Sequence, residues 1–218
     1  MSSTRFQRAR SGQAKREREQ AILTAAVALA SDRGIRNVTL TDIAGEVGLH
    51  KSAMLRYFET REQIFLTLTA LGWRDWSASL RSKLAGMTCD TASAEIAAAF
   101  AGSLVARPIF CDLLAQAPLN LERNVSLEAV HSFKLVTLEE VGLICAELRR
   151  LRPQLDETGA VDVIAAATGL AGALWQMATP GPQVAQLYRD DPRLSHAIVD
   201  VEPRLVRILT ALLDAHRS

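Results

Sequence analysis

Residues 38–65 decide the fold of this chain, and they read VTLTDIAGEVGLHKSAMLRYFETREQIF. Apolar residues recur at the helical period on both sides of Gly48, which divides the stretch into two short segments. Glycine readily takes the backbone conformation that ends a helix in a tight turn. Thr39 and Asp42 have the spacing of a capping box at the start of the first segment. The stretch therefore predicts two short helices joined by a turn.

The segments around this pair also have the helical period, and the alternation typical of strands is absent. A first helix is expected to end near Arg33, the pair to span about 40–47 and 50–57, and a longer helix to start near Thr60. Later helices are expected at about 91–106, 109–116, 126–151, 156–177 and 201–216. The sequence thus predicts an all-α protein.

The composition favours a protein with a large core and no membrane partner. Of the 218 residues, 49% are apolar, which is enough to bury a sizeable core. The most apolar stretch, Val163 to Ala178, has about 16 residues, whereas a membrane-spanning helix needs roughly 20. The basic N-terminus is not followed by the apolar segment that a secretion signal requires. We therefore expect a cytoplasmic protein.

The cysteines and histidines do not have the spacing of a metal site or a disulfide framework. The three cysteines are far apart and odd in number: Cys89, Cys111 and Cys145. The histidines are scattered in the same way: His50, His131, His196 and His216. No metal and no cofactor is expected.

The charge is distributed unevenly, although the formal net charge is only +1. Residues 1–62 contain 11 Lys or Arg and 7 Asp or Glu, whereas residues 63–218 contain 14 and 17. A local excess of positive charge indicates a nucleic-acid partner, so the N-terminal part is the candidate. Residues 1–14 are expected to be a flexible basic arm, which either contacts DNA or serves only as a solubilising tail.

The quoted stretch resembles the DNA-binding segment of the tetracycline-repressor (TetR) family, and the resemblance extends over about residues 16–66. The positions that carry it are Thr39, Ile43, Ala44, Gly48, Lys51, Tyr57, Phe58, Arg61 and Glu62. Two positions differ from the family, which commonly has serine in place of His50 and an aromatic residue in place of Leu55.

The resemblance implies two domains and a symmetric assembly. After the arm, a three-helix helix-turn-helix domain is expected at residues 15–62. Residues 63–218 are expected to form a larger helical domain for effector binding and dimerisation. A homodimer would place two recognition helices about one DNA turn apart, where they read a palindromic operator in double-stranded DNA.

The family pattern and the chemistry of helix ends indicate which residues contact DNA. Thr39 and Thr41 lie at a helix N-terminus, where free amides attract phosphate. Lys51, Ser52 and Ala53 begin the recognition helix, so their side chains are expected to reach base edges. Further contacts, mainly to the DNA backbone, are expected from His50, Arg56, Tyr57 and Arg61.

Two apolar segments near the C-terminus are candidates for the dimer interface. The first, residues 160–178, is rich in small residues and favours a close helical neighbour. The second has an apolar stripe formed by Val201, Leu205, Ile208, Leu209 and Leu212. The resemblance implies a four-helix seam across a two-fold axis. The alternative is that these segments are buried within one chain.

The resemblance also implies a cavity for a small apolar effector. Its candidate walls are Trp73, Trp76, Phe100, Phe110, His131, Phe133 and Trp175. The alternative for each aromatic residue is an ordinary place in the core. His131 differs from the others because it is a polar group in a mostly apolar helix.

The function implied by the resemblance is repression. An effector weakens operator binding because effector and DNA favour different distances between the two DNA-binding domains of the dimer. An activator or a regulator that needs a co-repressor would have the same DNA contacts. An enzyme using Cys111, His131 and Glu128 is the remaining alternative. The sequence contains no paired nucleophile and base, phosphate loop or metal-ligand spacing, so no catalytic residue is expected.

Overall fold

The computed structural model describes the backbone of residues 3–215 and the side chains of residues 12–215. This part of the chain consists of helices and connecting turns and contains no strand, as predicted. Its N-terminal unit comprises α1 (Ser3–Arg33), the 3-10 helix η1 (Ile35–Asn37), α2 (Leu40–Glu46) and α3 (Lys51–Met54).

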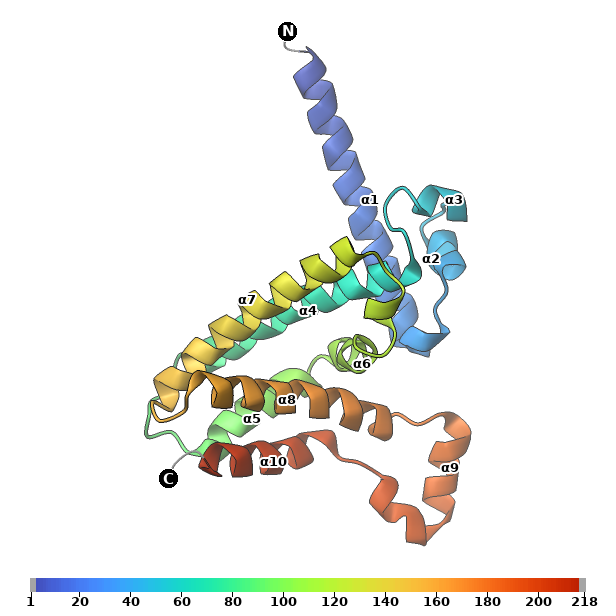
Figure 1. Ribbon diagram of the computed structural model, residues 1–218. Coiled ribbons are helices and arrows are strands. Elements are labelled where there is room, and N and C mark those ends of the chain that lie inside the picture. The colour runs from blue at the N-terminus through green and yellow to red at the C-terminus, as the bar shows by residue number, and fades with distance from the viewer. Residues whose placement is uncertain (1–2, 216–218) are drawn as a thin grey trace.

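Helix α4 (Arg61–Leu84) leads from the N-terminal unit into a larger C-terminal unit (Figure 1). The elements of the C-terminal unit are α5 (Ser93–Val105), α6 (Pro108–Gln116), η2 (Leu121–Arg123), α7 (Leu127–Leu151), α8 (Glu157–Ala178), α9 (Pro182–Asp190), η3 (Pro192–Ala197) and α10 (Val201–Ala215). The five later helices predicted from periodicity are all present, whereas α9 and η3 were not predicted.

The expected flexible arm is, from Ser3 onward, the first part of α1. Its composition is compatible with a helix, because Arg, Gln and Ala are frequent in residues 3–14 and are good helix formers. Side-chain pairs one turn apart support the helix, since Gln13 donates to Glu17 at 3.0 Å and Lys15 lies 3.7 Å from Glu19. The side chains of residues 1–11, which carry much of the predicted basic charge, lie outside the described part.

Helices α4 and α7 lie side by side and run in the same direction (Figure 1). At their starts, the backbone amide of Ser126 donates to Glu59 at 3.1 Å. Near their ends, the guanidinium of Arg150 donates to the carbonyl of Leu84 at 2.8 Å. The two helices therefore form a parallel pair that begins beside the N-terminal unit.

Helix α8 is the most apolar helix and lies inside the C-terminal unit. It is long and apolar enough to resemble a membrane span, but half of its apolar window is buried against α6, α7, α10 and α5. At Gly172 an added Cβ would lie only 2.9 Å from the backbone nitrogen of Ala115 in α6. Gly172, on the buried face of α8, therefore serves a close helix crossing within the chain. Helices α5 and α6 taken together are also long and apolar enough to span a membrane, but the pair is bent by 88° at the break before Pro108.

The predicted dimer stripe of α10 is mostly used within the chain. Val201, Leu205 and Leu209 are buried, because α10 packs on α5 and α8. Ile208 remains 38% exposed, and Leu212 is half-buried. The expectation of an intermolecular seam thus needs correction for the three buried residues, which face the core of their own subunit.

Candidate nucleic-acid interface

The start of α2 is fixed by the capping box that the sequence predicts. The Thr39 hydroxyl accepts the amide of Asp42 at 3.2 Å, and the Thr39 amide donates to the Asp42 carboxylate at 2.8 Å. The Thr39 hydroxyl also donates to this carboxylate at 2.7 Å. This hydrogen bond, then the one from the Thr39 amide, and the Arg33 guanidinium 3.1 Å away lower the pKa of Asp42. The carboxylate is therefore held ionised beside the first turn of the helix.

The turn between α2 and α3 depends on Gly48, whose φ of +64° lies in the left-handed region. The chain reverses there, and the amide of Leu49 donates to the carbonyl of Ala44 at 2.8 Å. Ile43 and Ala44 from α2 and Met54 from α3 are buried beneath the turn. The two short helices are thus locked together by a small apolar core, which leaves the other face of α3 in solvent.

The exposed face of α3 carries most of the predicted DNA contacts. His50 caps the helix, with Nδ1 accepting the amide of Ser52 at 3.4 Å. Lys51 and Arg56 are exposed and form no ion pair within the described residues. The regular helix ends at Met54, earlier than predicted, and single turns continue the chain to Phe58. Of the predicted contacts in the N-terminal unit, Thr39, Thr41, His50, Lys51, Ser52 and Arg56 are exposed, and Ala53 and Tyr57 are half-buried.

Arg61 is placed differently from its prediction as a phosphate contact. Its Nε and Nη2 donate to the backbone carbonyls of Val38 and Ile35, and its Nη1 lies 2.9 Å from Glu62. The guanidinium also lies over the ring of Phe65, 4.8 Å from its centroid. Because its donors are directed into the protein, Arg61 joins the segment around η1 to α4 in the unbound chain.

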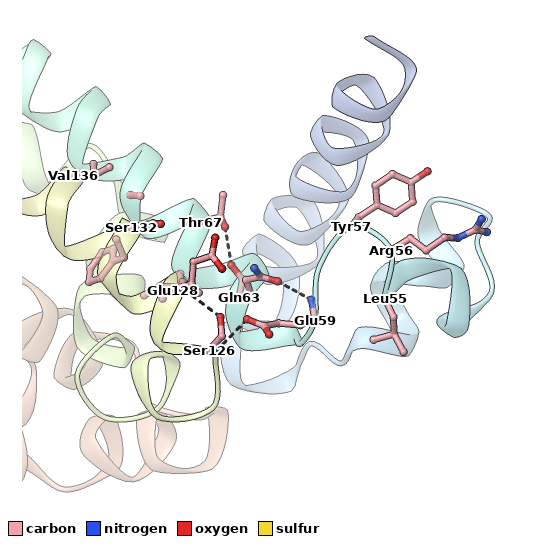
Figure 2. Close-up of a pocket in the computed structure, with 14 residues that line it drawn as sticks. Leu55, Arg56, Tyr57, Glu59, Gln63, Thr67, Ser126, Glu128, Ser132 and Val136 are labelled. Atoms are coloured by element: carbon pink, nitrogen blue, oxygen red, sulfur yellow. Dashed lines mark hydrogen bonds between the residues drawn. The ribbon is translucent and has the colours of Figure 1, made fainter. Parts of the chain in front are cut away.

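A cleft of about 450 Å³ separates the end of α3 from α4 and α7 (Figure 2). Arg56 and Tyr57 lie on the side of α3, whereas Glu128 and Ser132 lie on the side of α7. Glu59 lies between them, and the hydrogen bonds from Ser126 lower the pKa of its carboxyl. This link across the cleft has no local sequence signal, because its partners are 67 residues apart.

Four of the predicted effector residues form one aromatic cluster in the core. Trp73 and Trp76 meet edge to face with centroids 5.4 Å apart, and Phe110 and Phe100 complete the cluster. The indole of Trp76 donates to the hydroxyl of Ser103 at 2.9 Å, so its polar group is satisfied internally. All four side chains are buried and fill the space between α4, α5 and α6.

The other three predicted effector residues lie apart from this cluster. Phe133 lines the 450 Å³ cleft of Figure 2. Trp175 lines a larger cavity of about 720 Å³, and His131 is exposed on α7. Phe110 also borders a third cavity of about 320 Å³, between α1, α4 and α6. The seven residues therefore do not surround one common space.

Of the residues considered for catalysis, Cys111 lies on α6, whereas Glu128 and His131 lie on α7. The Cys111 thiol is buried and donates to the carbonyl of Leu104 at 3.3 Å, and burial raises its pKa to about 12. A thiol of this pKa does not supply a thiolate near neutral pH. His131 lies in solvent on another helix. The described residues also contain no group of three or more His, Cys, Asp or Glu that could hold a metal ion.

A short brace helix, a glycine turn and an exposed capped helix together define a helix-turn-helix protein of the DNA-binding class. The sequence profile described as "Bacterial regulatory proteins, tetR family" matches residues 22–68, and the one described as "Tetracyclin repressor-like, C-terminal domain" matches residues 71–214. The chain belongs to the tetracycline-repressor family of transcriptional regulators. No curated protein sequence matches the chain significantly.

Solved structures show the same fold at low sequence identity. A possible TetR family transcriptional regulator from Streptomyces coelicolor A3(2) has a TM-score of 0.62 and 17% identity, covering 91% of this chain and 98% of that one. The Thermus thermophilus repressor FadR, solved with lauroyl-CoA, has a TM-score of 0.60 and 16% identity, covering 92% and 95%. The fatty acid degradation regulator FadR from Bacillus halodurans has a TM-score of 0.55 and 14% identity, and the match covers 89% of this chain and 96% of that one.

Proposed function

We propose that the chain is a homodimeric repressor that binds a palindromic operator and is released by a small effector. The exposed face of α3 carries this proposal. His50, Lys51 and Ser52 stand at the start of the recognition helix, and Arg56 follows in the next turn. These side chains have few partners inside the chain and are free to meet base edges and phosphates. We keep Thr39, Thr41, Ala53 and Tyr57 as further contacts.

The proposed dimer uses the faces of α8 and α10 that the chain leaves exposed. On α8 these are Val161, Ala165, Gly169 and Ala173, which lie four residues apart along one face. Ile208 of α10 is exposed on a helix that packs against α8. Small residues allow two helices to approach closely, and a two-fold axis would bring four helices together. Such a protein works in the cytoplasm, where the operator is.

The proposed effector is small and mostly apolar, and it binds beside α4, α6, α7 or α8. Three of the candidate side chains border cavities, namely Phe110, Phe133 and Trp175. The T. thermophilus FadR is a repressor solved with lauroyl-CoA, so this compound is a suitable first probe. Effector and operator must weaken each other's binding by the same factor if the effector releases the protein.

The site assignment can be tested by fluorescence anisotropy with the DNA upstream of the protein's own gene and with random DNA, over a salt series. Lys51→Ala is expected to lower operator affinity by about 1–3 kcal/mol, or roughly 5- to 150-fold, if Lys51 reads a base. Tyr57→Phe should weaken binding both to this DNA and to random DNA. Lys83→Ala, at another exposed lysine near the far end of α4, is the matched control. Unchanged binding by both Lys51→Ala and Tyr57→Phe would show that the contact surface is wrong.

A further inference from the structure

Asp112 of α6 connects three segments that are far apart in the sequence. One carboxylate oxygen, Oδ2, accepts the backbone amide of Ile35 in η1 at 3.2 Å. The other, Oδ1, accepts the side-chain amide of Gln176 in α8 at 2.7 Å. A single side chain thus joins the N-terminal unit to two helices of the C-terminal unit.

The Ile35 amide needs an external acceptor because of its position. It is the first residue of η1, and the first amides of a helix have no acceptor within that helix. The preceding residue is Gly34, which has no side chain to cap the helix. Ile35 is only 1% exposed. Asp112 therefore supplies from α6 the cap that the local sequence does not provide.

Apolar contacts leave the junction around Asp112 incompletely filled. The cavity of about 720 Å³ lies here, between the end of α1, η1, α6 and the end of α8, and Asp112 and Gln176 are part of its wall. On the far side, α6 and α8 cross closely at Ala115 and Gly172, so these two helices form one rigid body. The polar bridge thus connects this body directly to the backbone of η1.

A second carboxylate links the units on another side of α4. Glu59 accepts the amide of Ser126 at the start of α7, beside the 450 Å³ cleft. The 720 Å³ cavity and the 450 Å³ cleft are thus each lined by one carboxylate that accepts a backbone amide. Loss of Asp112 would leave the Glu59 link and the continuous helix α4 in place, so the N-terminal unit would be loosened rather than detached.

We propose that Asp112 is a positioning residue that fixes the angle between the N-terminal unit and the α6–α8 body. In the homodimer this angle sets the distance between the two recognition helices, and this part rests on the proposed function. Asp112→Ala removes both hydrogen bonds. Asp112→Asn keeps an acceptor for Ile35, and its amide can donate to the Gln176 carbonyl oxygen if the Gln176 amide turns over. Asparagine should therefore restore the position that alanine loses.

The angle can be measured within one subunit, independently of DNA binding. Glu46 of α2 and Asp162 of α8 are exposed, and each is replaced by cysteine and spin-labelled in a Cys89→Ser background. Electron–electron double resonance on labelled protein diluted with unlabelled protein gives the distance distribution. Asp112→Ala is expected to broaden or shift it, whereas Asp112→Asn and the control Asp75→Asn leave it unchanged. An unchanged distribution in Asp112→Ala would overturn the proposal.

Operator spacing provides the readout in the dimer. The parent protein should discriminate against operators with one base pair added or removed between the half-sites, and Asp112→Ala should lose about tenfold of this discrimination. Gln176→Leu, which breaks only the α8 hydrogen bond, should have a smaller effect of the same kind. A loss of stability in Asp112→Ala with unchanged spacing preference and unchanged distances would mean a structural role only. If no operator is bound by the parent, the proposed function fails, and the distance measurement still decides the role of Asp112. If Asp112→Ala does not fold, the distance and spacing measurements on Gln176→Leu decide it.

Discussion

The close crossing of α6 and α8 makes Gly172 a sensitive position. A Cβ added there would lie 2.9 Å from the nitrogen of Ala115 and 3.2 Å from its Cα, and both are backbone atoms that cannot rotate away. One helix must therefore move by several tenths of an ångström. Overpacking of this kind costs about 1–3 kcal/mol. Alanine recovers about 0.5–1 kcal/mol relative to glycine in a helix. We expect Gly172→Ala to lower the free energy of unfolding by about 1 kcal/mol, near the middle of a range of roughly 0–2.5 kcal/mol.

For a chain of this size a loss of about 1 kcal/mol corresponds to a decrease in Tm of about 2–4 °C. The assay is urea unfolding followed by circular dichroism, with a thermal melt of the same samples. The control is Gly142→Ala, at an exposed glycine of α7 whose added Cβ would meet nothing within 4 Å. This variant should gain about 0.5–1 kcal/mol, because only the helix propensity changes. The reasoning is refuted if Gly172→Ala is as stable as Gly142→Ala.

Arg61→Ala should lower the free energy of unfolding by about 1.5–3 kcal/mol, because charged hydrogen bonds to two backbone carbonyls are lost. It should leave the salt dependence of DNA binding unchanged, and a reduction of that dependence at unchanged stability would instead identify a phosphate contact. Iodoacetamide near neutral pH should modify exposed Cys89 and spare Cys111 in the folded chain, because burial raises the pKa of Cys111 to about 12; mass spectrometry of the peptides checks this. Glu59→Gln should reduce the acid sensitivity of folding. The pKa of Glu59 is lowered in the fold by Ser126, so its contribution is present above the unfolded pKa and is lost as the pH falls through the folded value; equal unfolding curves of both proteins across acid pH would contradict this.

The parts of the fold that sequence predicted are those with local signals. The capping box of Thr39 and Asp42 and the turn at Gly48 depend on residues that are neighbours in the chain, and both were predicted. Helix α9 was not predicted, because it is short, contains no buried residue and begins at the second of two prolines, Pro182. The turn-forming segment TPGP at residues 179–182 gave no reason to continue the helical prediction directly after α8.

The parts of the site that sequence could not predict depend on distant partners. The family pattern suggested a phosphate contact for Arg61, but its acceptors lie 23 and 26 residues earlier. No role was predicted for Asp112, because neither Ile35 nor Gln176 is near it in the sequence. The aromatic residues were correctly placed on helices, yet helical spacing cannot distinguish a cavity wall from a filled core, and Trp76 and Phe100 lie in the core.

Helix α4 is common to both units, and this has a consequence for how the protein can be divided. Its first turns pack under α1, and its last turns lie among the helices of the C-terminal unit, without a break between Arg61 and Leu84. A protease finds no loop at this boundary. A cut within the helix would also uncover Ile64, Phe65 and Leu68, which are buried. The DNA-reading head should therefore resist excision as a soluble fragment, and it can be moved to another scaffold only together with this shared helix.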